Sequence, residues 1–566
     1  MGRAARPHGR HGRRRTAARR PGDAHRRNHR GGPRAPRDGV GARRGGERGD
    51  PRPGDRCDLG ARAAPQRRGR GRLPRRRVRP ARAARGGRPA RRLDARPRGR
   101  VEAAVRPHRH AEPGPLGGGA VSAATPPDVP EVPRASGFTG PDAPALSDLQ
   151  NCIHCGFCLP ACPTYIATGQ ELESPRGRLH LIRGVVEGKV EPTPRLLSHL
   201  DLCLQCRACE TACPSSVPYG RIMEDARASV MADRSTRPRE WAMRARLLRN
   251  VVARPRVLRA ALWFGRVYTR SGLQRLLRGP LGRLLPEPLA NLEAQAPTLD
   301  RAPFRRSGEL VERRGDGPRV ALLTGCVHGE LYPQTHEATV RVLGHLGCEV
   351  IAPPEQACCG ALHAHAGDAE AARRLARRNI EAFEEAGVDA VIVNAAGCGA
   401  AMKEYGRLLR NDEEWAERAE RFASTVRDVL EFVATLDFER GLGRVEADVT
   451  LQDACHLAHG QGILAAPRAI LDAIPGVDLH EQATPDRCCG AAGLYSTVQA
   501  AMSREVLDAK VADISGTGAS TVVTSNPGCT MQIQAGLRRA RRPGEVLHLI
   551  ELLDRSYAAG FEEARA

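Results

Sequence analysis

Two short segments of the sequence concentrate cysteine at a spacing that suits iron–sulfur chemistry. "CIHCGFCLPACP" (152–163) and "CLQCRACETACP" (203–214) both read C-x2-C-x2-C-x3-C followed by proline. Three thiolates at three-residue spacing surround one cuboidal cluster, while the fourth, before the proline, ligates the neighbouring cluster. Zinc ribbons use pairs of C-x2-C rather than triplets. We therefore predict two [4Fe-4S] clusters.

This crossed ligation divides the eight cysteines into two sets. The first thiol set is Cys152, Cys155, Cys158 and Cys213, and the second thiol set is Cys203, Cys206, Cys209 and Cys162. Such clusters carry one electron each, and bond chemistry is not their role. We expect an electron wire and assign no catalytic residue to this chain.

Eight further cysteines form a duplicated pattern that is a candidate for an additional cluster or metal. The first copy has Cys326, Cys358, Cys359 and Cys398, and the second has Cys455, Cys488, Cys489 and Cys529. A glycine follows each Cys-Cys pair, and the spacings agree to within one residue, which indicates an internal duplication. Redox-active thiols are the alternative to metal. Cys348 stands outside the pattern, and we interpret it as a buried free cysteine.

The elements that must position these thiols alternate between strand and helix. Each copy begins with a short apolar strand, and helical and strand patterns then alternate, which favours parallel sheets with crossover helices. Ligands of such sheets lie beyond the carboxyl ends of the strands. We expect strands ending on cysteine at 319–326, 388–398, 448–455 and 520–529.

The predicted fold class is therefore α/β, with a small helical two-cluster ferredoxin-like domain ahead of two duplicated parallel-sheet modules. Residues 236–316 are basic and helical in pattern, with a long helical stretch at 244–268. Its arginines indicate either surface helices packed on the protein or contact with an anionic membrane. The predicted boundaries are a linker at 121–148, the ferredoxin-type domain at 149–235, the connecting region at 236–316, module 1 at 318–440 and module 2 at 446–558.

The excess positive charge belongs to the first 120 residues. They hold 37 Arg and 9 acidic residues, whereas residues 121–566 hold 52 Lys+Arg against 55 acidic residues. The first segment has no Phe, Tyr, Trp or Ile, so it cannot bury a core, and we expect disorder. We interpret it as non-native, translated in the wrong frame ahead of a start near Val121. No nucleic acid is expected as a partner.

Other signals of location and catalysis are missing from the sequence. There is no window of 18 uncharged apolar residues, and no G-x-G-x-x-G motif follows a predicted strand. We see no flavin or substrate site on this chain. Five histidines near the cysteines are interpreted as hydrogen-bond donors to sulfur or as surface residues rather than as ligands: His154, His328, His363, His365 and His456. We expect a cytoplasmic protein, peripheral on the inner face of the membrane.

Several motifs together resemble the iron–sulfur subunits of bacterial glycolate oxidases. They are "CIHCGFCLPACPTY", "ELESPRGRLHLI", "LDLCLQCRACETACPSSVPYGRIM", both Cys-Cys-Gly modules and "SNPGCTMQIQAGLRR", spanning about 149–558. The resemblance implies a complex with two FAD-binding subunits that oxidises glycolate to glyoxylate. It also implies electron transfer to a membrane acceptor such as quinone, and places the cluster ligands on the eight ferredoxin-type cysteines.

Three alternatives accompany this interpretation. Iron–sulfur subunits of lactate or anaerobic glycerol-3-phosphate dehydrogenases share the same domain order. The Cys-Cys-Gly modules also resemble those of heterodisulfide reductases, which would make the chain a thiol reductase, but there each module ends in C-x2-C. In heterodisulfide reductases such a module can hold an unusual cluster. Here Ala401 and Gln532 stand where the extra cysteine would be, which argues against that cluster in this chain. Nucleic-acid binding would rest on residues 1–120 alone.

Overall fold

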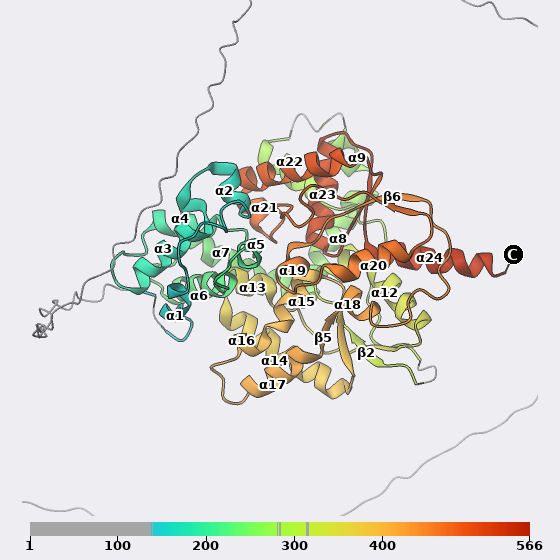
Figure 1. The fold of residues 1–566 in the computed structure, drawn as a ribbon, viewed down its shortest axis with the longest axis horizontal. Helices are drawn as coiled ribbons and strands as arrows, with labels where there is room; N and C mark the ends of the chain where they lie inside the picture. Colours follow the sequence, from blue (N-terminus) through green and yellow to red (C-terminus); the bar gives the residue numbers. More distant parts are fainter. Residues whose placement is uncertain (1–136, 139, 280, 282–284, 313–315, 566) are drawn as a thin grey trace, which may run out of the picture. The chain divides into compact units, whose positions relative to one another are not determined.

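A computed structural model describes residues 137–138, 140–279, 281, 285–312 and 316–565 of the chain. The expectations for residues 1–120 and for most of the 121–148 linker lie outside this range. The ferredoxin-type part is helical (Figure 1). Its helices are α1 (Leu146–Gln150), α2 (Pro163–Thr168), the 3-10 turn η1 (Glu171–Glu173), α3 (Pro175–Val186), α4 (Pro194–Asp201), α5 (Ala208–Thr211) and α6 (Tyr219–Ala232).

Local sequence explains where these helices begin. Helices α2, α3 and α4 each start on proline, whose fixed φ suits the first helical position and whose missing N–H costs nothing there. The side chains of Ser174 and Thr193 cap α3 and α4 by accepting backbone N–H groups. A small core that includes Ile182, Leu200 and Met223 holds the helices together.

The connecting region is a run of basic helices that is interrupted where the sequence predicted continuity. Helix α7 (Arg239–Leu247) passes through a π-helical turn, η2 (Leu248–Val252), and α8 (Pro255–Arg270) then begins on proline. Pro255 cannot donate a helical hydrogen bond, so the predicted 244–268 stretch is broken before it. Helices α9 (Leu273–Arg278) and α10 (Glu287–Gln295) follow.

Module 1 is built on a five-stranded sheet of order β1-β3-β2-β4-β5. Four strands are parallel, whereas β1 (Gly308–Val311) runs antiparallel to β3 on the sheet edge. The connecting region thus supplies a strand that its helical pattern did not predict. The other strands are β2 (Arg319–Leu322), β3 (Glu349–Ala352), β4 (Ala390–Val393) and β5 (Val426–Asp428). The helices are α11 (His328–Leu331), α12 (Pro333–His345), α13 (Ala361–His365), α14 (Ala369–Ala386), α15 (Ala396–Lys403), α16 (Tyr405–Leu408), α17 (Ala416–Thr425) and α18 (Val429–Val433).

Module 2 repeats this topology with a four-stranded parallel sheet of order β7-β6-β8-β9. Its strands are β6 (Ala447–Leu451), β7 (Val477–Leu479), β8 (Thr521–Thr524) and β9 (Glu545–His548). Its helices are α19 (Cys455–Ala458), α20 (Ala465–Ala473), α21 (Tyr495–Val498), α22 (Ala500–Gly516), α23 (Pro527–Arg539) and α24 (Leu549–Glu563). The parallel α/β architecture and the duplication are as predicted.

The two modules share one hydrophobic core. Val320 and Val350 of module 1 belong to the same buried group as Val449, Val522 and Ile550 of module 2. The C-terminal helix α24 packs on α12 of module 1.

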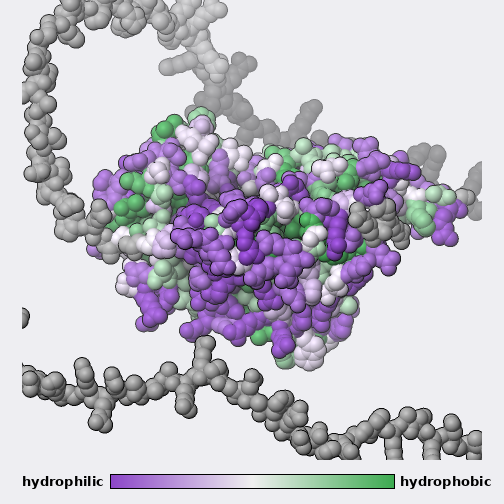
Figure 2. Space-filling model, turned by 90° about the horizontal axis from the view of Figure 1, so that it is seen from below, coloured by the Kyte–Doolittle hydropathy of each residue, from purple (hydrophilic) through white to green (hydrophobic). Residues whose placement is uncertain are grey.

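The molecular surface shown in Figure 2 is mostly hydrophilic. In the part of the chain that the structure describes, no helix has the length and apolarity needed to cross a membrane.

Candidate iron–sulfur sites

The two cysteine loops of the ferredoxin-type part share left-handed backbone at two corresponding positions. His154 (φ 58°) and Gly156 (φ 86°) in the first loop correspond in position to Gln205 (φ 53°) and Arg207 (φ 64°) in the second. Left-handed residues wrap each loop around a cavity. Because this conformation costs a non-glycine residue about 1–2 kcal/mol, its recurrence points to a functional constraint on both loops.

Each predicted thiol set lines a cavity of its own. One cavity is lined by the first thiol set, together with Leu179 and Tyr219, and the other by the second thiol set. Cys209 borders both cavities. The fold thus brings Cys213 to the first loop and Cys162 to the second, the crossed arrangement expected from the spacing. Iron ligation by these thiols remains a prediction.

The chemistry of both cavities fits a bound cationic cluster better than free thiols. Burial raises the pKa of Cys158 to about 11 and raises that of Cys209 well above its usual range. Without a cation these groups stay protonated, whereas coordinated iron deprotonates a thiol outright. The side-chain amide of Gln205, on the wall of the second cavity, is buried and has no hydrogen-bond partner in the described structure.

A buried arginine supplies positive charge to the second cavity. Arg178 lines it and donates to Glu173 Oε2 (2.8 Å), to Thr164 Oγ1 (3.1 Å) and to the carbonyl of His199 (2.7 Å). Thr164 Oγ1 in turn lies 3.3 Å from Cys162 Sγ. Burial raises the pKa of the Cys162 thiol, and the Arg178 charge partly offsets that effect. Arg178 therefore stabilises negative charge on the thiols of this set.

The four thiols of module 1 converge into a continuous group. Cys326 Sγ lies 3.4 Å from Cys358 Sγ, and Cys359 Sγ lies 3.1 Å from Cys398 Sγ. Hydrogen bonds from Cys326 and Cys359 hold the pKa of Cys358 well below the usual thiol range. The group therefore favours a thiolate at Cys358, the state in which a metal binds or a thiol reacts.

A polar clamp that sequence patterns did not reveal holds the Cys-Cys backbone of module 1. Asn379 on α14 accepts from the Ala357 N–H (2.7 Å) and donates to the Cys358 carbonyl (3.1 Å) and to Tyr405 Oη (3.0 Å). Tyr405 donates to the Cys359 carbonyl (2.8 Å). Both side chains are fully buried, so the clamp fixes the two adjacent thiols.

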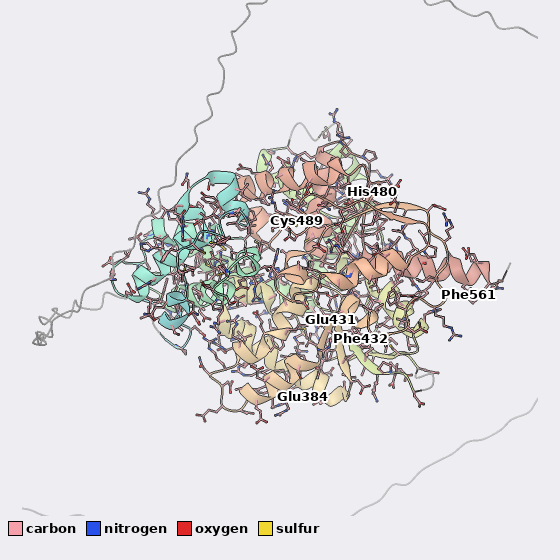
Figure 3. The ribbon with its side chains drawn as sticks, in the orientation of Figure 1. Glu384, Glu431, Phe432, His480, Cys489 and Phe561 are labelled. Carbon is pink, nitrogen blue, oxygen red and sulfur yellow. The ribbon has the colours of Figure 1, made fainter. Side chains whose placement is uncertain are left out.

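The thiols of module 2 contact one another in the same pairs, Cys455 with Cys488 and Cys489 with Cys529, and other groups donate to them. Gly490 N donates to Cys488 Sγ (3.4 Å), and Asn526 Nδ2 donates to Cys529 Sγ (3.6 Å). His456 Nδ1 lies 3.5 Å from Cys455 Sγ, the hydrogen-bonding role expected for a histidine beside a cysteine. Figure 3 labels Cys489 inside this module. Where module 1 has Asn379, module 2 has the buried Lys510. Lys510 Nζ donates to Gln482 Oε1 (3.2 Å) in the loop that precedes Cys488.

In both modules some cysteines lie beyond the strands rather than on them. Cys398 and Cys529 lie in the first turns of α15 and α23, and Cys455 begins α19. The strands stop a few residues earlier than the apolar pattern predicted, because the chain turns into a helix as soon as it leaves the sheet. The thiols still gather at the carboxyl edge of each sheet.

Module 2 lies directly against the second thiol set. The thiols of Cys206 and Cys488 contact each other, and this hydrogen bond, with burial, raises the pKa of Cys206 well above its usual range. Leu204, Tyr495 and Val506 enclose the contact in a small apolar group. Tyr495 also donates to the Leu202 carbonyl (2.9 Å). The ferredoxin-type part and module 2 therefore form one buried thiol-lined region.

The carboxyl edges of the two sheets also meet. Asn526 Oδ1 accepts from Gly397 N (3.3 Å) of module 1 while its amide donates to Cys529 of module 2. Ala396 N donates to the Ser525 carbonyl (3.0 Å). The residues preceding Cys398 and Cys529 are thus bonded to each other across the module boundary.

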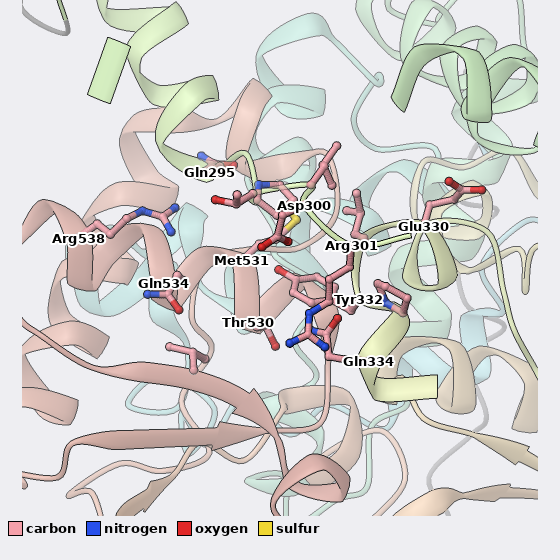
Figure 4. Close-up of a pocket in the computed structure, with 16 residues that line it drawn as sticks. Gln295, Asp300, Arg301, Glu330, Tyr332, Gln334, Thr530, Met531, Gln534 and Arg538 are labelled. Atoms are coloured by element: carbon pink, nitrogen blue, oxygen red, sulfur yellow. The ribbon is translucent and has the colours of Figure 1, made fainter. Parts of the chain in front are cut away.

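Figure 4 shows another cavity, at the junction of the connecting region and both modules. Its lining includes Asp300, Arg301, Tyr332, Met531 and Arg538, and no cysteine or histidine of the described residues borders it. It lies apart from both cavities of the ferredoxin-type part, and we assign no chemistry to it.

Three sequence families match the chain in the order of its structural parts. "4Fe-4S dicluster domain" matches residues 148–217, and "Glycolate oxidase iron-sulfur subunit, linker region" matches residues 239–296. "Cysteine-rich domain" matches twice, at 320–403 and 449–534, in agreement with the duplication.

Individual relatives cover most of the described structure. A probable glycolate oxidase iron–sulfur subunit of Bacillus subtilis is 41% identical over 72% of this chain and 93% of its own length. The glycolate oxidase iron–sulfur subunit of Escherichia coli is 34% identical over 73% of this chain and 95% of its own length. Lactate utilization protein A of an Exiguobacterium species is 32% identical, but over 42% of this chain and 97% of its own length.

Proposed function

The chain belongs to the family of glycolate oxidase iron–sulfur subunits, and from this premise we propose the residues that carry electrons in it. The first thiol set holds one [4Fe-4S] cluster and the second thiol set holds the other. The observation that carries this assignment is that each set lines a separate cavity in the fold. The chain thereby acts as the electron-transfer subunit of an enzyme that oxidises glycolate to glyoxylate.

The chain's own residues provide ligands, charge and exclusion of water. A bound [4Fe-4S] cluster accepts and releases one electron at a potential set by hydrogen bonds, burial and nearby charge. Tyr219 Oη donates to Cys203 Sγ (3.6 Å), and Arg178 places a buried cation beside the second set. Both contacts stabilise negative charge on the sulfurs of the second thiol set, and both therefore favour the reduced state of that set.

The chemistry of the substrate supports flavin-bearing partners. Oxidation of glycolate to glyoxylate removes two electrons and two protons, whereas each thiol-lined site handles one electron. A flavin can take up two electrons together and release them one at a time, and we place it on two FAD-binding partner subunits. Ile153 and Phe157, both about two-thirds exposed beside the exposed Cys155, supply an apolar contact for the electron donor. A quinone in the membrane is the proposed acceptor.

Iron content and magnetic spectra test the ligand assignment. We expect Cys155→Ser and Cys206→Ser each to lower bound iron by about four atoms per chain and to change a different cluster signal in electron paramagnetic resonance spectra. The control is Cys348→Ser, since Cys348 is a buried thiol whose pKa burial raises to about 11. Full iron and both signals in either test variant would contradict the assignment.

A second candidate function concerns the modules, where the 3.1 and 3.4 Å sulfur contacts favour a metal or redox centre. We propose that the duplicated cysteines hold an additional cluster or metal. Iron above about eight atoms per chain, lost in Cys358→Ser or Cys488→Ser, supports this site. If the chain binds about eight iron atoms and no other metal, the modules act through their thiols alone.

A further inference from the structure

Helix α8 exposes a stripe of apolar side chains on the face that points away from the protein. On its inner face Leu258 is buried, and Arg266 donates to Glu330 Oε2 (2.9 Å). On the opposite face Trp263 and Phe264 are 57% and 67% exposed. Val257, Phe264 and Val267 share that face because they recur at helical spacing. Packing among the described residues does not use this stripe.

The exposed apolar surface continues onto the neighbouring helices. Met243 and Leu247 of α7 are exposed, as are Leu273 and Leu276 of α9. Helix α8 contacts α9 directly and joins α7 through η2. Scattered exposed apolar residues are ordinary, but a succession of them over three joined helices marks an interaction surface. We call these four residues, with Val257, Trp263, Phe264 and Val267, the apolar face.

The same helices carry an unbalanced positive charge. Residues 241–286 contain eleven Arg and no Lys, Asp or Glu, although the rest of 121–566 is net acidic. Some of these arginines form ion pairs within the fold, such as Arg244 with Asp201 and Arg249 with Asp368. Among the described residues of this segment, the exposed arginines that form no ion pair are Arg246, Arg254, Arg256, Arg270 and Arg275. Their charge is available to an anionic partner.

We propose that α7–α9 bind the surface of an anionic lipid bilayer. Trp263 and Phe264 enter the boundary between headgroups and acyl chains, and the free arginines contact lipid phosphate. This face offers arginine donors and apolar side chains, which match the layers of a bilayer: phosphate outside and hydrocarbon beneath.

Tryptophan emission of the intact chain tests this inference independently of cluster ligation. The three tryptophans are Trp241, Trp263 and Trp415, and Trp263 alone is exposed. Vesicles of phosphatidylglycerol should shift the emission to the blue and protect it from acrylamide, whereas phosphatidylcholine vesicles and high salt should not. Residues 1–120 hold 37 arginines, so co-sedimentation alone does not test the face.

Variants separate the apolar and the electrostatic contributions. Trp263→Phe should abolish the emission shift, which assigns it to this residue. Arg256→Ala with Arg275→Ala should raise the lipid concentration at half-maximal shift about 25-fold, because each arginine near the surface contributes a factor of about five. Phe264→Ser should also raise it, whereas Phe561→Ser, a matched exposed aromatic on α24 (Figure 3), should leave it unchanged.

Two outcomes would overturn the inference. One is sedimentation with anionic vesicles that leaves Trp263 emission and quenching unchanged, because residues outside this face then account for the binding. The other is Trp263 protection by the purified flavoprotein partner and not by vesicles, which would make the face a subunit interface.

Discussion

At the scale of single residues, the spacing predicted which cysteines meet in each cavity, and it did not predict their supporting contacts. The C-x2-C-x2-C-x3-C spacing limits how thiols can surround a cluster, so it carries geometric information by itself. Asn379 and Tyr405 follow the Cys-Cys pair by 20 and 46 positions and belong to helical patterns that show no sign of a polar role. Their function arises from tertiary packing, which a local pattern does not contain.

The Asn379 clamp gives a prediction about stability. Asn379→Ala leaves the Ala357 N–H, the Cys358 carbonyl and the Tyr405 hydroxyl without their partner in a buried site. We expect the free energy of unfolding to fall by about 2–4 kcal/mol in urea titrations, since each buried unpaired group costs about 1–3 kcal/mol. Asn250→Ala, which removes an exposed helix-surface bond, is the control. Equal losses in the two variants would argue against the clamp.

At the scale of elements, alternating apolar and helical patterns located the strands and the major helices. Element ends were less accessible, because the apolar run continues past the last ladder hydrogen bond into the following helix. The antiparallel strand β1 escaped prediction because its pairing with β3 is set by the edge that module 1 leaves open. Pro255 marks the break in the sequence, but the helical periodicity on both sides of it favoured one continuous helix.

The paired glycines after each Cys-Cys motif give a prediction at this scale. Gly360 and Gly490 have φ of +83° and +85°, but a Cβ at Gly490 would lie 2.6 Å from the Ser503 carbonyl oxygen. At Gly360 the nearest atom would lie at 3.4 Å. Gly360→Ala should cost about 1–2 kcal/mol from backbone strain alone. Gly490→Ala should cost clearly more in the same unfolding titration, and equal costs would mean that the Ser503 backbone gives way.

At the scale of the whole molecule, duplication predicted two similar modules, and the structure joins them into one core. Their union depends on contacts that no repeat pattern encodes, such as α24 on α12. Three buried histidines lie at this junction: His328, His336 and His548. The ring centroids of His328 and His336 are 4.7 Å apart. Burial lowers the pKa of His336 to about 4, and burial with the nearby His336 lowers that of His548 to about 3.

These histidines make the joined modules sensitive to acid. The unfolded chain takes up their protons near pH 6.5, whereas the folded chain does so only near pH 4 or below. The free energy of unfolding should therefore fall as pH drops below 6.5, by about 1.4 kcal/mol per pH unit for each histidine. His548→Asn should reduce this slope, and the exposed His180→Asn should leave it unchanged. A wild-type slope in His548→Asn would contradict this explanation.

The unequal exposure of the two thiol sets has a consequence for how the metal centres are assembled and lost. Cys155 is exposed to solvent, whereas Cys203, Cys206 and Cys209 are buried, and Cys206 lies against Cys488 of module 2. With the ligation proposed above, iron at the first set should exchange with small chelators in the folded chain, whereas iron at the second set should be released only when module 2 separates from Cys206. Chelation should proceed in two phases, the slower one accelerating with urea. The same proposal predicts that the buried set is filled before module 2 closes over it.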